Sequence, residues 1–363
     1  MAQVKKTTNG LSSEFIIHPG ETLKEILIDR NINQNTLAIA TGVSAKHISK
    51  ILSGQSDISV SYAKKLEYAL GIEAQFWINL QSNYDREVFE YEEANEISQD
   101  EIDILKIINQ AIDELNYYGF LEKNMPNHQC VLKLRSLLAV SNLCDIPKLT
   151  NTGAYRIAAN VNPYVLYSWQ KVCELKNFAY ETENALDIQK LKDSIPEIKK
   201  CMFMDPNEMR EKLRKIFSKC GIVFDIVKNY KGAPVQGYVK HLSSNRLLLC
   251  MTIRGQYMDI FWFSLFHEIG HIINGDTKNT FIDYEDVDGQ IESKADTFAR
   301  NTLINIDDYL LFISGDYGNI ESIESFAKKQ KIDRSIVIGR LLKEDKIDYK
   351  YFNKYRKKYE WCE

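Results

Sequence analysis

Apolar residues recur at helical spacing through the first 84 residues and predict a series of short helices. The predicted helices are Glu21–Arg30, Gln34–Thr41, Ala45–Leu52, Val60–Leu70 and Ala74–Asn83. Asn33, Ser44 and Ser59 occupy N-cap positions, where a short polar side chain accepts a backbone N–H. Glycines stand where these helices should end: Gly42, Gly54 and Gly71. Together these signals predict an all-α N-terminal domain over residues 1–84.

The helical pattern continues over residues 85–205 without a chemical motif. Prolines interrupt the pattern at Pro126, Pro147, Pro163 and Pro196. We interpret these residues as a helical linker or accessory region. A spacer domain and a layer added to another domain are both consistent with the pattern.

The hydrophobic period changes after a helix that is predicted over Met209–Lys219. Three β-rich segments follow, each bounded by turn residues: Gly221–Val227, Gln236–His241 and Arg246–Thr252. A strongly apolar helix is predicted over Met258–Asn274, and a polar loop to about Gly289 precedes further helices. Strands beside helices predict an α+β C-terminal domain over residues 206–363, so we expect a multi-domain chain.

Composition changes this picture mainly through the uneven distribution of charge. The 363 residues carry a formal net charge of −4, which by itself gives no sign of nucleic-acid binding. Residues 1–72 hold eight basic and six acidic residues, and residues 85–103 hold one basic and nine acidic. Residues 328–358 hold twelve basic and four acidic. Such runs indicate segments with different roles, although a solvated helix face would also explain the basic run.

Other sequence features bear on the cellular location. No apolar run approaches the roughly 18 to 20 residues that a membrane helix needs. The first ten residues lack the apolar core of a signal peptide, and the seven cysteines show no CxxC spacing. We therefore expect a cytoplasmic protein with reduced thiols and no membrane partner.

Residues 34–52, QNTLAIATGVSAKHISKIL, have the pattern of a helix-turn-helix. Leu37 and Ile48 would face the core, and Gly42 would supply the tight turn between the helices. The outward side chains are then short or cationic, which suits base edges and phosphates in a DNA major groove. The predicted DNA-contacting residues are Gln34, Ala45, Lys46, His47, Ser49 and Lys50. An antiparallel helical hairpin with an ordinary polar face would give the same bare pattern.

The segment around this motif resembles the Xre-type repressor domain of HigA-like antitoxins. The resemblance runs from His18-Pro19-Gly20 through Phe76-Trp77-Ile78-Asn79-Leu80-Gln81, about a fifth of the chain. It implies binding to double-stranded operator DNA by a homodimer that reads a palindromic site, often that of its own operon. It also implies a cognate toxin as a protein partner.

A second motif lies in the long apolar helix, where His267-Glu268-Ile269-Gly270-His271 matches HExxH. At helical spacing the two imidazoles project from one face and can chelate Zn²⁺. Glu268 can then polarise water as a general base. A buried helix with two hydrogen-bonded histidines is the alternative, but burying two imidazoles and a carboxylate without a metal needs many partners.

A catalytic zinc needs a third protein ligand. The extended pattern with a third histidine fails, because Asn274 and Thr277 stand where Gly and His would be required. Carboxylates in the polar loop are candidates: Asp276, Asp283, Glu285, Asp286 and Asp288. Glu292 instead opens a helical stretch that can hold a ligand rigidly. Asp296, one turn later, either accepts a hydrogen bond from a ligating histidine or is an exposed helix charge.

These stretches resemble the ImmA/IrrE family of metallopeptidases. The matching residues are Phe261–His271 and Glu292–Ala299, and the late segment IDRSIVIGRLLKEDKI is similar as well. The resemblance implies a zincin-like (gluzincin-like) α+β domain with Zn²⁺ as cofactor, and often the cleavage of a transcriptional repressor. The metal ligands that it implies are His267, His271 and Glu292, and the catalytic base is Glu268.

Three functions are consistent with these two motifs. The protein is a repressor fused to a metallopeptidase, or an antitoxin-like regulator that binds a toxin and holds a structural or sensory metal, or a peptidase that DNA binding merely positions. We favour a DNA-binding transcriptional regulator whose zinc peptidase domain cleaves a repressor or partner protein. The non-enzymatic antitoxin is the alternative.

Overall fold

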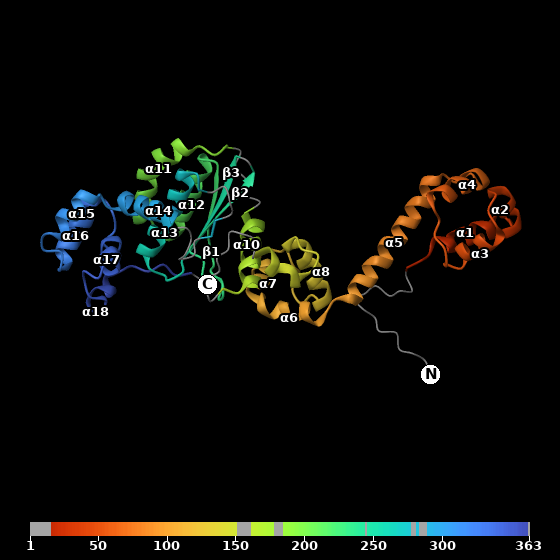
Figure 1. Ribbon diagram of the computed structural model, residues 1–363, viewed down its shortest axis with the longest axis horizontal. Coiled ribbons are helices and arrows are strands. Elements are labelled where there is room, and N and C mark those ends of the chain that lie inside the picture. The colour runs from red at the N-terminus through yellow and green to blue at the C-terminus, as the bar shows by residue number, and fades with distance from the viewer. Residues whose placement is uncertain are drawn as a thin grey trace. The chain divides into compact units, whose positions relative to one another are not determined.

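The computed structural model describes residues 16–150, 161–177, 184–243, 245–276, 281–282 and 289–361. The chain forms two compact units (Figure 1). The first unit comprises residues 1–103 and 124–134, and the second comprises residues 104–123 and 135–363. In the described part of the chain, no helix is long and apolar enough to cross a membrane.

Five helices form the N-terminal part of the first unit, as an all-α domain requires. They are α1 (Pro19–Asp29), α2 (Gln34–Thr41), α3 (Ala45–Leu52), α4 (Val60–Leu70) and α5 (Ala74–Glu96). The side chains of Asn33, Ser44 and Ser59 each accept a backbone N–H at the start of α2, α3 and α4. Gly42 and Gly71 take left-handed φ angles of 63° and 67° and end α2 and α4.

Two of these helices differ from the sequence prediction in their bounds. α1 begins at Pro19 rather than Glu21, because proline fits the first turn and His18 Nδ1 accepts the Gly20 N–H at 2.9 Å. α5 continues to Glu96 instead of ending at Asn83, since neither Gly nor Pro interrupts residues 84–96. The boundary expected after residue 84 therefore falls inside a continuous helix.

The core of this helical domain is apolar and draws on all five helices. Its buried side chains include Leu23, Leu27, Leu37, Ile48, Ile51, Leu66 and Trp77. A Cβ atom at Gly20 would overlap the carbonyl oxygen of Ile51, so α1 and α3 can approach this closely only with glycine there.

A four-stranded mixed sheet lies at the centre of the second unit. Its strands are β1 (Ile222–Val227), β2 (Gly237–Ser243), β3 (Arg246–Thr252) and β4 (Phe281–Ile282), in the order β1-β3-β2-β4. β1 pairs parallel with β3, whereas β2 pairs antiparallel with both β3 and β4. The first three strands follow the predicted β-rich segments. β4 was missed, because two residues are too few to show an alternating pattern.

Helices before and after the sheet build the apolar core of the second unit. α12 (Pro206–Lys219) and α13 (Met258–Asn274) lie on the same side of the strands (Figure 1). Phe217, Phe224 and Trp262 are among the buried residues that join α12, β1 and α13 in one cluster. The α-helices that follow α13 are α14 (Gly289–Leu303), α15 (Ile306–Ile313), α16 (Ile320–Gln330), α17 (Arg334–Lys343) and α18 (Tyr349–Phe352).

The helical middle region is shared between the two units. Its helices are α6 (Gln99–Ile107), α7 (Asn109–Tyr117), α8 (Asn127–Leu138), α9 (Ile146–Thr150), α10 (Pro163–Asn177) and α11 (Ile188–Lys200). The Trp169 indole on α10 donates to the Lys228 carbonyl at 2.8 Å and contacts the Tyr238 ring of β2. On α7, Glu114 accepts a hydrogen bond from Tyr230 at 2.6 Å. Part of this region is thus a layer of the sheet domain.

One carboxylate is fully buried in the sheet and is paired with three cations. Arg210 and Arg214 of α12 lie 2.7 and 2.6 Å from Asp225 Oδ1, and Lys176 of α10 lies 3.2 Å from Oδ2. Burial alone would raise the pKa of Asp225, but the three cations outweigh it and the pKa is lowered. These ion pairs fasten α10 and α12 to β1.

The C-terminal segment is fastened to the start of α13. Arg356 makes a bidentate ion pair with Asp259, with N···O distances of 2.9 and 2.6 Å, and both side chains are buried. The same guanidinium stacks on the Tyr257 ring at 3.8 Å. Three residues after Asp259 on α13, the Trp262 indole donates to the Tyr359 hydroxyl at 3.0 Å. The C-terminal segment therefore packs against the first turns of α13.

We expect Arg356→Ala to destabilise the second unit, because it leaves the buried Asp259 carboxylate without its cation. The free energy of unfolding should fall by about 3 to 5 kcal/mol, measured by urea titration with tryptophan fluorescence. Arg334→Ala is the matched control, because its pair with Glu324 is exposed and should be worth about 1 kcal/mol or less. Equal losses for the two variants would contradict the importance of the buried pair.

We also expect the N-terminal domain to lose stability in mild acid through His18. Burial lowers the pKa of His18 below 6.5, against the opposing effect of Asp57, Asp85 and Glu21. The unfolded chain then binds the proton first, so stability is greatest above pH 6.5 and falls as the pH drops through the lowered pKa.

The comparison is with His18→Asn, which can still cap α1 but does not titrate. Thermal unfolding followed by circular dichroism at about pH 7.5 and about pH 5.5 should show a larger loss in the wild type. Parallel losses in the two proteins would show that another group is responsible.

Candidate functional sites

The first site is built by α2, the turn at Gly42 and α3, which together form a helix-turn-helix. Leu37 and Ile48 are buried at 1% and 0% exposure and fix the two helices against each other. The Val43 N–H donates to the Ala38 carbonyl at 3.1 Å and closes the turn. The turn chemistry and the core residues are those that the sequence predicted.

The structure places the predicted DNA-contacting side chains at two levels of exposure. Gln34, Lys46, Ser49 and Lys50 are exposed. Ala45 and His47 are half-buried. The His47 ring meets the buried Tyr62 ring edge-on, with centroids 5.8 Å apart. The exposed residues of α3 are spaced three and four apart and so share one helix face.

The second site is a pair of buried imidazoles one turn apart on α13. The Nε2 atoms of His267 and His271 lie 2.9 Å from each other, and the two residues are only 4% and 2% exposed. His267 Nδ1 lies 3.0 Å from Asp296 Oδ1 on α14. That hydrogen bond lowers the pKa of Asp296. The predicted partner of a ligating histidine therefore contacts His267.

Glu268 is also buried, at 1% exposure, and its carboxylate lies against the start of β2. A Cβ atom at Gly237 would overlap Glu268 Oε1, so the carboxylate takes the space that a side chain there would fill. On another side of α13, a Cβ at Gly270 would lie 3.2 Å from Ala295 Cα of α14. Small residues thus let β2 and α14 approach the histidine pair closely.

The predicted third metal ligand falls where the structure describes least. Glu292 lies within α14, but its side chain is outside the described residues. The loop candidates outside the described residues are Asp283, Glu285, Asp286 and Asp288. Asp276 is described, and its Oδ2 lies 3.6 Å from Nδ1 of His271. Among the described side chains, no three His, Cys, Asp or Glu gather into a metal-binding group.

The residues present nevertheless fit a zinc ion. Two imidazole nitrogens, His267 Nε2 and His271 Nε2, converge on one point, and imidazole is a preferred zinc ligand. Asp296 accepts from His267 Nδ1, so the lone pair of that ring lies on Nε2, which faces the convergence point. A glutamate at position 292 on the facing helix would complete the set.

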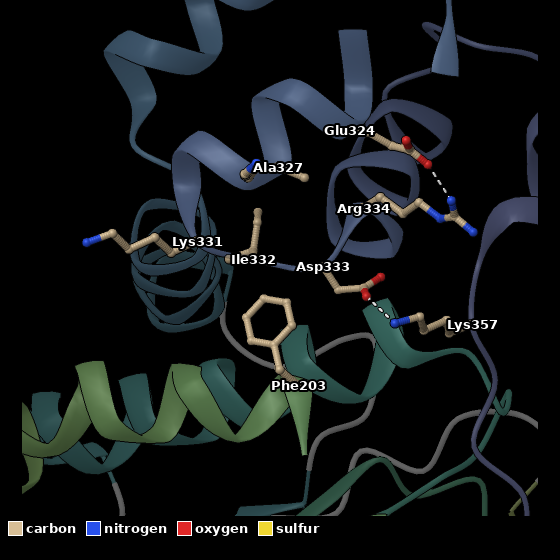
Figure 2. Close-up of a pocket in the computed structure, with 9 residues that line it drawn as sticks. Phe203, Glu324, Ala327, Lys331, Ile332, Asp333, Arg334 and Lys357 are labelled. Atoms are coloured by element: carbon tan, nitrogen blue, oxygen red, sulfur yellow. Dashed lines mark hydrogen bonds and ion pairs between the residues drawn. The ribbon is translucent and has the colours of Figure 1, made fainter. Parts of the chain in front are cut away.

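A separate hollow of about 490 Å³ lies beside the turn between α16 and α17. In Figure 2, Phe203 faces Ile332 across this hollow. Two of its cations are already neutralised, because Arg334 pairs with Glu324 and Lys357 pairs with Asp333. The hollow shares no residue with the histidine pair.

Two contacts of the histidine site were missed by the sequence analysis. Gly237 lies on a strand 31 residues before Glu268, and nothing in the local pattern connects the two. Asp276 was considered as a direct metal ligand, but it faces the Nδ1 side of the His271 ring. Only the fold reveals which ring nitrogen a carboxylate approaches.

Comparison with known proteins agrees with the geometry of the first site. A helix-turn-helix family model matches residues 23–77. Virulence-associated protein I of Dichelobacter nodosus is 37% identical over 75 residues, which are 20% of this chain and 69% of that protein. The class that the fold and site define is the helix-turn-helix DNA-binding domain of the Xre type. Through this N-terminal domain, the chain belongs to the helix-turn-helix family that includes virulence-associated protein I.

Solved structures are similar to this chain over 23% of its length. The antitoxin HigA of Pseudomonas aeruginosa with the higBA promoter is 36% identical, over 23% of this chain and 96% of that chain, with a TM-score of 0.21. A HigA-family addiction module antidote protein from Coxiella burnetii is 29% identical, over 23% of this chain and 95% of that chain, with a TM-score of 0.20.

Proposed function

We propose that the protein is a DNA-binding transcriptional regulator of the HigA-like antitoxin type whose C-terminal domain is a zinc-dependent peptidase. The observation that carries the regulatory part is the exposed face of α3, where Lys46, Ser49 and Lys50 project from a helix-turn-helix with an apolar core. A second helix in this position enters the major groove, so these side chains would meet base edges and phosphates.

A homodimer is the form in which we propose that the domain acts. One α3 helix supplies few phosphate contacts, because it carries two exposed lysines, Lys46 and Lys50. Two copies related by a two-fold axis would double these contacts and read a palindromic operator. A cognate toxin is the protein partner that the antitoxin resemblance suggests, and regulation of its own promoter would follow from such pairing.

We expect the double variant Lys46→Ala, Lys50→Ala to abolish binding to the promoter DNA of its own gene, while the helical circular-dichroism signal stays unchanged. The control is Lys24→Ala, Lys65→Ala, which removes the same charge from α1 and α4. Gel-shift titrations at several salt concentrations should show that the control keeps the salt dependence of the wild type. Retained promoter binding by the α3 variant would overturn the assigned recognition helix.

The peptidase part of the proposal is supported by the buried set on α13. His267 and His271 would bind the zinc with Glu292 as the third ligand, and Asp296 would hold the His267 ring. When bound, zinc supplies Lewis-acid polarisation of the scissile carbonyl and makes water more acidic. A buried pair of imidazoles beside a buried glutamate is the chemistry that such a reaction needs.

Glu268 would carry the proton transfers of peptide hydrolysis. Its carboxylate would take a proton from the attacking water and deliver it to the departing amine nitrogen. Burial against Gly237 keeps the carboxylate at a fixed position beside the histidine pair. The proposed substrate is a repressor or another partner protein.

We expect Glu268→Gln to keep zinc binding and promoter binding but to lose proteolysis, because glutamine cannot accept the proton. The assays are zinc content by mass spectrometry, gel shift, and cleavage of the protein that the adjacent gene encodes. Glu360→Gln, at an exposed position, is the control and should behave as the wild type.

Cleavage by the wild type and its loss in Glu268→Gln would establish the peptidase. Identical behaviour of the two proteins in every cleavage assay would overturn it and favour the antitoxin with a structural or sensory metal. A wild type that takes up no zinc would remove the metal site as well.

A further inference from the structure

Asp276 occupies a place around the histidine pair that mirrors that of Asp296. Asp296 faces Nδ1 of His267 at 3.0 Å, and Asp276 faces Nδ1 of His271 at 3.6 Å. Asp276 follows the end of α13 directly, whereas Asp296 comes from α14. Each imidazole therefore has a carboxylate beside the ring nitrogen that points away from the other imidazole.

With both rings neutral, the two contacts leave one arrangement of the ring protons. A carboxylate can only accept, so the 3.0 Å contact places a proton on Nδ1 of His267. Nε2 of His267 is then an acceptor, and the 2.9 Å contact requires His271 to donate from its own Nε2. Nδ1 of His271 thus presents a lone pair toward Asp276.

The longer distance at Asp276 follows from this arrangement. Two acceptors that face each other form no hydrogen bond, and 3.6 Å is outside the hydrogen-bond range. Asp276 Oδ2 is nevertheless buried and accepts no hydrogen bond within the described residues. A buried carboxylate oxygen is costly without a donor. His271 Nδ1 is close enough to become that donor if it carries a proton.

We propose that Asp276 is a positioning residue for metal binding, which accepts a hydrogen bond from His271 Nδ1 when both Nε2 atoms bind a cation. The cation needs the Nε2 lone pair of His271, so the ring proton must lie on Nδ1, from which it is donated in a hydrogen bond to Asp276. This is a change of tautomer, and no proton leaves the ring overall. This inference rests on the proposed zinc site and assigns Asp276 to the orientation of His271 instead of direct ligation.

The test measures zinc affinity in the full-length protein by competition with a chromophoric chelator. Asp276→Ala should bind zinc about 10- to 100-fold more weakly than the wild type. Asp276→Asn should lose less, because its amide oxygen can still accept from Nδ1. Asp345→Asn is the matched control, since Asp345 is exposed and its left-handed φ of 52° is as favourable for asparagine.

Two further readouts separate positioning from a general structural role. In ¹⁵N NMR spectra of the zinc-loaded wild type, His271 should carry its proton on Nδ1, and this signal should shift upfield in Asp276→Ala. The metal-free Asp276→Ala protein should be at least as heat-stable as the metal-free wild type, because the variant removes one of two opposed acceptors. If Asp276 had a general structural role, its loss would instead lower the heat stability of both the metal-free and the zinc-loaded protein.

Each outcome bears on a different proposal. Zinc affinity of Asp276→Ala within twofold of the wild type would overturn the positioning role and leave the zinc site intact. Equal losses in Asp276→Asn and Asp276→Ala would identify Asp276 as a ligand and also overturn it. A wild type that binds no zinc would overturn the metal site of the proposed function, and this inference with it.

Discussion

The burial of polar groups on α13 is the constraint around which the second unit is arranged. Thirteen of the seventeen residues of this helix are buried, and they include two imidazoles and two carboxylates. Each needs a neighbour that satisfies or accommodates it. Arg356 pairs with Asp259 near the start of the helix, Asp296 pairs with His267 further along it, and Gly237 of β2 leaves room for Glu268. Strand, helix and C-terminal segment are thus all positioned by the same helix.

A structural feature was predictable from the sequence when all the residues that determine it lie in one short segment. The caps at Asn33 and Ser44 and the turn at Gly42 determine α2 and α3 within about twenty residues, and the structure places these helices at the expected bounds. The role of α10 was not predictable, because it depends on the contact of Trp169 with Tyr238, residues far apart in the sequence. The position of Asp276 was missed for the same reason, since spacing along a helix cannot show which ring nitrogen a loop residue approaches.

The net charge of a segment also did not show which of its charged side chains form ion pairs and which are exposed. The basic run near the C-terminus pairs five of its twelve cations with carboxylates in the described part of the chain. Three of these carboxylates, Asp259, Asp308 and Glu324, lie outside the run, so the segment is partly neutralised by its neighbours in space. The N-terminal domain shows the opposite case. Its small excess of positive charge includes the exposed Lys46 and Lys50 on a single helix face.

Gly237 has a consequence for how this domain can evolve. Its φ is not in the left-handed region, so its own backbone would accept other residues. The neighbouring Glu268 carboxylate is what excludes a side chain there. Relatives that have lost the glutamate are therefore freed to replace this glycine, whereas relatives that keep the glutamate are not. The residue that position 237 can tolerate is therefore expected to depend on the side chain at position 268.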